Sequence, residues 1–260
     1  MIKRKHLLNA AAILFIIFEC VMFCLIHFTK IDNDINLRYA SIIAAAVFAW
    51  LTLLIEVVTA GSEGERIADI LLNKRNGNCI RIAMLFTLLA DYFMVALPTA
   101  NNLAGVSVFL GTQLFVFFHI ILNDESKKSR MANIICRLAL TPIAVLVAFL
   151  ILGSGANAMA IISVVYYANL LTNAIFAHRI GKGGIMLTVG LVLFALCDVN
   201  VGLQGLASIY SNGLDEGSLL YLLTNTSVDM IWVFYVPSQT LIPLSILYFE
   251  KSEKPKAAVK

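Results

Sequence analysis

The stretch "IMLTVGLVLFALCDVNVGLQG", residues 185–205, contains a single charged residue, Asp198. It is long enough to cross a bilayer as a helix, which requires about 20 apolar residues. A charged side chain at the bilayer centre costs at least about 2.5–3.5 kcal/mol, and such residues usually serve a function. The stretch therefore predicts a transmembrane helix and marks Asp198 as a candidate functional residue.

The composition of the whole chain supports the same environment. Of its 260 residues 60% are hydrophobic and 13% are charged, with a mean hydropathy of +0.87. A soluble domain carries about 25% charged residues. Lipid admits only helices and closed barrels, and the apolar runs lack the alternation of barrel strands. We therefore predict an all-α polytopic membrane protein.

Eight apolar runs predict the transmembrane helices of one integral membrane domain over residues 1–260. We expect the loop 206–228 to be external, and no loop is large enough for a separate soluble domain. The predicted helices cover about residues 7–28, 40–58, 80–97, 104–122, 134–152, 157–178, 185–205 and 229–249.

The basic residues predict the orientation. With eight crossings both termini lie on the same side of the membrane. All but two of the 19 Lys and Arg residues fall on that side, if Arg81 and Arg137 are counted with the loops that they flank. Only Lys30 and Arg38 fall on the other side. Because cytoplasmic loops are rich in Lys and Arg, we predict that both termini face the cytoplasm.

A second carboxyl lies within an apolar run, at Asp91 of "LLADYFMV", residues 88–95. At 1.5 Å per residue, Asp91 and Asp198 lie about 16 and 20 Å from the inner ends of their helices, so they share one level. Polar residues of four further helices reach this level. They are Glu19, Thr112, Gln113, Tyr166, Asn169, Asn173, Tyr235 and Gln239. We predict one interior polar cavity near the midplane, although Asn and Gln also serve as hydrogen-bond partners between membrane helices.

Two carboxyls in one cavity are coupled, so that one can hold a proton while the other is ionised. This division suits general acid and base catalysis, and it equally suits proton-coupled transport. The sequence has no phosphate-binding Gly-rich loop, no G-x-S-x-G elbow and no HExxH motif. No ligand spacing supports a metal site, so we expect no metal or other cofactor and no nucleic acid partner.

The order of these motifs resembles that of the YhhN family of lysoplasmalogenases, which are eight-helix membrane proteins. Ala90, Cys197 and Pro237 depart from the family pattern, which has Gly and Ser at the first two positions. The matching segments are "LLADYFMV" with Asp91, "FLGTQLFVFFHIIL" with Gly111, Phe115 and His119, "VVYYANLLTNA" with Tyr166, "LFALCDVNVGL" with Phe194 and Asp198, and "FYVPSQTLIPLS" with Tyr235 and Gln239.

The resemblance implies a reaction and a reacting pair. Asp91 and Asp198 would cleave the vinyl ether bond of a lysoplasmalogen, releasing a fatty aldehyde and a glycerophospho-base. The substrate would be lysoplasmenylethanolamine or lysoplasmenylcholine, reached from the lipid bilayer of a bacterial cytoplasmic membrane. The supporting residues would be His119, Tyr166, Asn169, Tyr235 and Gln239.

Two other functions remain open on the sequence. A proton-coupled transporter of a small molecule or lipid could use the same Asp pair as a relay, and a faint similarity between "LLAD" and "ALCD" fits a duplicated transporter architecture. A non-catalytic lipid-binding or structural membrane protein is the third reading.

Overall fold

A computed structural model describes residues 4–29, 35–63, 77–209, 218–226 and 228–250. Within these residues all regular structure is helical, and eight helices are long and apolar enough to cross a membrane, which confirms the predicted fold class. They are α1 (Arg4–Phe28), α2 (Ile35–Glu63), α4 (Asn78–Asp91) with the π-helical turn η1 (Tyr92–Ala96), α5 (Asn102–Asn123), α6 (Lys127–Leu152), α7 (Ala158–Ala177) with the 3-10 turn η3 (His178–Ile180), α8 (Lys182–Ile209), and α10 (Met230–Leu244) with α11 (Ile246–Glu250).

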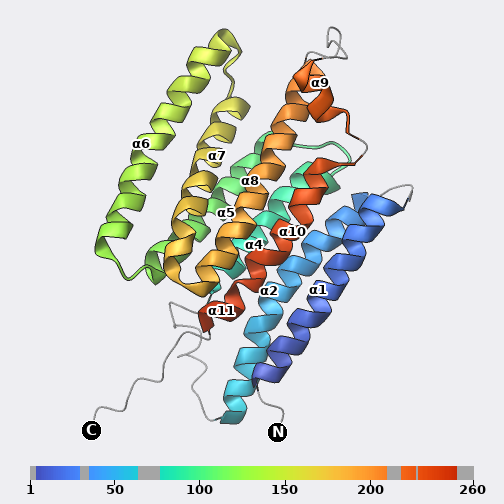
Figure 1. Ribbon diagram of the computed structural model, residues 1–260, viewed down its shortest axis with the longest axis vertical. Helices are drawn as coiled ribbons and strands as arrows, with labels where there is room; N and C mark the ends of the chain where they lie inside the picture. The colour runs from blue at the N-terminus through green and yellow to red at the C-terminus, as the bar shows by residue number, and fades with distance from the viewer. Residues whose placement is uncertain (1–3, 30–34, 64–76, 210–217, 227, 251–260) are drawn as a thin grey trace.

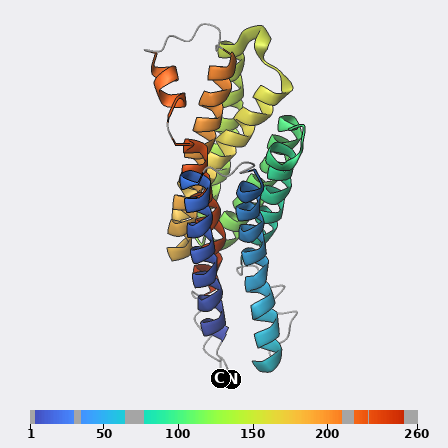
Figure 2. The same ribbon diagram turned by 90° about the vertical axis from the view of Figure 1, so that its right-hand side faces the viewer.

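The helices run along a common direction in both views of the bundle (Figures 1 and 2). Helices α8 and α10 pack closely along each other, and α4 packs along α5. Helix α6 lies at one edge and packs against α7, so most of its side chains are exposed (Figure 1). Because a membrane surrounds such a bundle, these exposed apolar side chains face lipid.

Several helix ends differ from the predicted ends. Helix α2 is longer at both ends, and α8 continues to Ile209, into the loop predicted from residue 206. A short helix, α9 (Leu219–Thr224), lies in the remainder of that loop. The ends differ because an apolar run corresponds to the part of a helix that lies in lipid, whereas the backbone hydrogen bonds of the helix continue into the flanking residues.

The third spanning helix changes its winding directly after Asp91. Helix α4 ends at Asp91 and continues directly into the π-helical turn η1, where the Leu97 amide donates to the Tyr92 carbonyl at 3.0 Å. Turns of π-helix are rare and are frequent at functional sites. Asp91 itself keeps α-helical dihedral angles (φ −67°, ψ −29°), so the altered winding changes the direction of the side chains that follow it.

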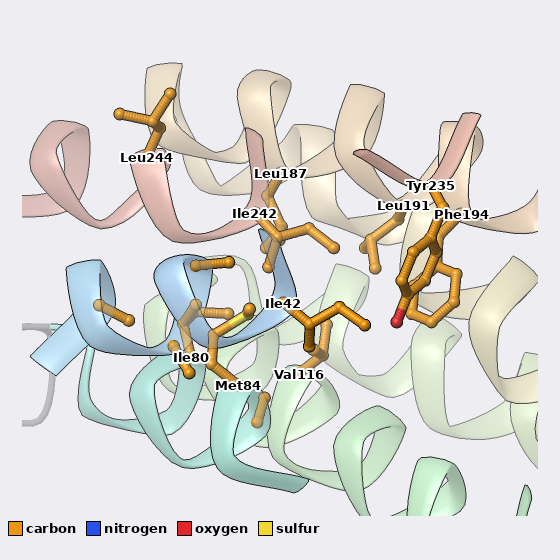
Figure 3. Packing of buried hydrophobic residues seen from close by; sticks show 14 of the residues in the cluster. Ile42, Ile80, Met84, Val116, Leu187, Leu191, Phe194, Tyr235, Ile242 and Leu244 are labelled. Carbon is orange, nitrogen blue, oxygen red and sulfur yellow. The ribbon is translucent and has the colours of Figure 1, made fainter. Parts of the chain in front are cut away.

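The buried core joins the spanning helices α1, α2, α4, α5, α7, α8 and α10. Figure 3 shows Leu187, Leu191 and Phe194 of α8 opposite side chains of α2, α4 and α5, with side chains of α10 beside them. Phe194 and Tyr235 lie next to each other at one end of this core (Figure 3). The core therefore fixes α8 and α10 relative to each other next to the residues of the candidate functional site.

Gly190 allows the close approach of α8 and α10. A Cβ atom there would lie 2.8 Å from Ile242 Cγ1 and 3.2 Å from the Ile242 backbone nitrogen. We expect Gly190→Leu to lower the free energy of unfolding by about 1–3 kcal/mol, the usual effect of overpacking. Gly202→Leu on the same helix is the control, because nothing lies within 4 Å of a Cβ there. Thermal unfolding of the purified variants tests this, and equal midpoints for the two would contradict it.

Candidate functional site

Asp91 is the last residue of α4 and is buried. Its Oδ2 atom accepts a hydrogen bond from the Tyr235 hydroxyl of α10, which is also buried. The Tyr235 ring packs at right angles to Trp232, with 5.3 Å between ring centroids. A buried tyrosine hydroxyl needs a polar partner, and here that partner is the carboxyl of Asp91.

Asp198 occupies the equivalent position in a second pair. It lies two-thirds of the way along α8, is partly buried, and its Oδ2 atom accepts a hydrogen bond of 2.7 Å from the Tyr166 hydroxyl of α7. Two carboxyls from two helices are thus each bound by a tyrosine from another helix. We call Asp91, Tyr235, Asp198 and Tyr166 the aspartate–tyrosine cluster.

Aromatic rings hold the two pairs together. The Phe194 ring lies between the two tyrosines, 5.5 Å from the Tyr235 centroid and 6.5 Å from that of Tyr166. The two carboxyls lie within electrostatic range of each other. The two carboxyls, for which the sequence predicts one level, therefore also lie near each other in the bundle. Helix α8 carries both Phe194 and Asp198.

Gln239 and His119 differ in their relation to this cluster. Gln239 follows Tyr235 by one turn of α10 and is buried. Within the described residues its side chain makes one weak contact, from Nε2 to the Ser238 hydroxyl at 3.5 Å. His119 is remote: Thr112 of α5 meets Thr87 of α4 at 3.3 Å. Since α4 and α5 are antiparallel neighbours, His119 and Asp91 lie about 16 Å apart along the bundle. The buried His119 ring instead contacts Asn123 at 3.4 Å and packs on Phe249.

Asn169 belongs to a separate polar group. Its Oδ1 atom accepts a hydrogen bond from Arg137 of α6, which also donates to Asn173 Oδ1 at 2.7 Å. Arg137 in addition contacts Asn133 Oδ1 at 3.4 Å, and Asn173 Nδ2 donates to Gln113 Oε1 at 2.9 Å. We call these five residues the arginine–amide cluster.

The prediction of one shared polar cavity is therefore wrong for some of its members. Glu19 accepts a hydrogen bond from Ser41 of α2, and both are buried between α1 and α2. Short polar side chains bind the nearest partner on the neighbouring helix, so groups at one depth separate into several clusters around the bundle.

Three charged residues inside the helices are not among the site residues that the sequence predicts. Arg81 is completely buried; it donates to Glu56 Oε1 at 3.0 Å, to Thr52 at 2.9 Å and to the Ala49 carbonyl at 3.1 Å. The sequence predicts that Arg81 and Arg137 flank loops, but both lie inside helices and donate hydrogen bonds to neighbouring helices. The sequence does contain a signal for these residues, because Arg81, Arg137 and Glu56 all lie inside the predicted apolar runs.

Among the described residues no group of three or more His, Cys, Asp and Glu side chains could hold a metal ion. The aspartate–tyrosine cluster combines two carboxyls with two hydroxyl donors, which suits proton transfer.

Comparison with protein-family models places the chain in one family. The model of the YhhN family matches residues 37–246, which include both pairs of the aspartate–tyrosine cluster. Comparison with curated proteins and with solved structures finds no match. The family match covers most of the chain, and it agrees with a helical bundle of eight possible spans and two intramembrane carboxyls. The protein therefore belongs to the YhhN family.

Proposed function

We propose that this protein is a membrane hydrolase that cleaves the vinyl ether bond of lysoplasmalogens. The observation that carries the proposal is the aspartate–tyrosine cluster, in which Asp91 and Asp198 approach each other inside the bundle, each bound by a tyrosine. Membership of the YhhN family supports a hydrolase of the membrane. The substrate carries its alkenyl chain within the bilayer, at the depth of these carboxyls.

The chemistry needs one carboxylic acid and one carboxylate. The acid transfers its proton to the vinyl carbon remote from the ether oxygen, which leaves an oxocarbenium cation stabilised by the other carboxylate. Water adds to the cationic carbon while that carboxylate takes the released proton. The resulting hemiacetal gives up its hydroxyl proton to one carboxylate, while the other carboxyl protonates the glycerol oxygen as its bond to carbon breaks. The products are a fatty aldehyde and a glycerophospho-base, with one water consumed.

The tyrosines position the carboxyls for these transfers. Each hydroxyl donates to the Oδ2 atom of its aspartate. The Oδ1 atom would therefore be the one that exchanges a proton with the reactants. A carboxyl held by one donor keeps a fixed orientation, and orientation is a large part of the advantage of general acid and base catalysis. Phe194 supplies an apolar wall between the two pairs.

The direct test uses purified protein in detergent with lysoplasmenylethanolamine. We expect release of fatty aldehyde and an equal amount of glycerophosphoethanolamine. The matched control is the saturated 1-alkyl ether of the same chain length, which cannot form the oxocarbenium ion by protonation and should remain intact. The proposal fails if the vinyl ether is also stable.

The same experiment separates the hydrolase from a transporter that uses the Asp pair as a proton relay. A transporter predicts no aldehyde and a pH-dependent uptake of substrate into proteoliposomes. Aldehyde release without uptake would leave the hydrolase as the function of the pair.

A further inference from the structure

The arginine–amide cluster has more hydrogen-bond donors than acceptors. Its side-chain oxygens are engaged: those of Asn133, Asn169 and Asn173 accept from Arg137, and that of Gln113 accepts from Asn173. Three buried donors have no partner within the described part of the chain. They are Arg137 Nε, Asn133 Nδ2 and Gln113 Nε2.

The cluster also carries an unbalanced charge. The ion pairs that connect described residues involve Arg4, Arg38 and Arg81, and Arg137 has neutral amides and the Phe117 ring as its neighbours. An unpaired charge within the membrane is costly, and unpaired buried donors add to that cost. A single anion with several acceptor oxygens would satisfy the charge and the donors together.

The position of the cluster relates it to the candidate active site. Asn169 follows Tyr166 by three residues on α7, so their Cβ atoms lie about 5–6 Å apart on one helix face. Tyr166 binds Asp198, and Asn169 binds Arg137. A ligand could therefore reach Asp198 with one group and Arg137 with another, separated by a short linker such as glycerol.

The Arg137 side chain is the part of the cluster that is accessible from the lipid side. Helix α6 is the edge helix of the bundle, and Arg137 is only half-buried, between the exposed side chains Ile134 and Leu138. An amphiphile could place a charged head group against Arg137 without crossing the core of the protein.

We propose that the arginine–amide cluster binds the phosphodiester of the lysophospholipid substrate and so places its vinyl ether at the Asp pair. This assignment rests on the proposed function for the identity of the lipid. Arginine suits the role because its planar guanidinium presents several donors in a geometry that matches phosphate oxygens. The glycerol backbone spans the step from Arg137 to Asp198.

Binding of uncleavable lipids tests the site independently of catalysis. The probes are 1-alkyl-lysophosphatidylethanolamine and the 1-alkylglycerol of the same chain, which lacks the phosphate. We expect the wild type to prefer the phospholipid. Arg137→Gln should weaken phospholipid binding about 10- to 100-fold, the usual effect of losing hydrogen bonds to a charged group, and leave alkylglycerol binding unchanged.

Control variants separate this role from general attraction and from loss of structure. Lys128→Gln removes an exposed charge from the first turn of α6 and should change neither affinity. Asn133→Leu removes one unpartnered donor, keeps the Arg137 bond to Asn173, and should weaken phospholipid binding severalfold. If Arg137→Gln does not fold, the Asn133→Leu variant still tests the proposal. The ratio of its phospholipid affinity to its alkylglycerol affinity is measured within one protein and does not depend on the other variant.

The outcomes distinguish the possible readings. Unchanged phospholipid affinity in Arg137→Gln and Asn133→Leu would overturn the proposal and leave Arg137 as a tie between helices. Displacement of the phospholipid by millimolar inorganic phosphate would assign the cluster to a free anion instead of a lipid head group. In the aldehyde assay, the proposal predicts that Arg137→Gln raises KM more than it lowers kcat. A protein that shows the binding preference but releases no aldehyde would refute the hydrolase and leave the anion site in place.

Discussion

Replacing either aspartate of the cluster with asparagine is expected to lower kcat for aldehyde release by about 10²–10⁴-fold, the usual contribution of general acid or base catalysis. Asparagine keeps the size of the side chain and still accepts a hydrogen bond from Tyr235 or Tyr166, but it cannot exchange a proton with the substrate or with water. The measurement is steady-state aldehyde release by purified Asp91→Asn and Asp198→Asn.

The double variant makes this prediction sharper. Because the two carboxyls act in one reaction, their effects should not multiply, and the double variant should be about as slow as the slower single variant. Glu19→Gln is the matched control: it alters another buried intramembrane carboxyl, one bound by Ser41 between α1 and α2, and should retain wild-type kcat. Wild-type rates in both single Asp variants would exclude the pair as the reacting groups.

Loss of the buried Arg81 side chain is expected to have the largest effect on stability. Arg81→Met removes the 3.0 Å partner of Glu56, and both side chains of this pair are 1% exposed. Breaking a buried ion pair by removal of one partner typically costs about 3–5 kcal/mol, because the remaining charge stays buried. We expect a large loss of folded protein in size-exclusion chromatography and a lower thermal midpoint.

The second substitution shows whether charge is the cause. Arg81→Met combined with Glu56→Leu removes both charges and should recover much of the lost stability. Arg38→Met provides the contrast, since the Arg38–Asp229 pair is 22% and 31% exposed and should contribute about 0–1 kcal/mol. A double variant as unstable as Arg81→Met alone would show that packing of the long side chain, and not its charge, is what matters.

The sequence by itself determined the number of spanning helices and the two carboxyls that face the interior. Both follow from the same physical fact: hydrocarbon requires long apolar helices and penalises any charge placed inside one. For Asp91 and Asp198, the equal depth predicted from the helical rise agrees with their electrostatic interaction in the bundle.

Tertiary structure decided which polar groups share a site. Depth along a helix follows from residue number, but the direction of a side chain around the bundle depends on how each helix is rotated against its neighbours. Asn169 therefore joined Arg137, and His119 joined Asn123 and Phe249, although each lies on a helix that also borders the aspartate–tyrosine cluster. The pairing of Tyr235 with Asp91 and of Tyr166 with Asp198 likewise depends on helix rotation. Each of these hydrogen bonds joins two helices, and the sequence of one helix does not specify how it is rotated against the other.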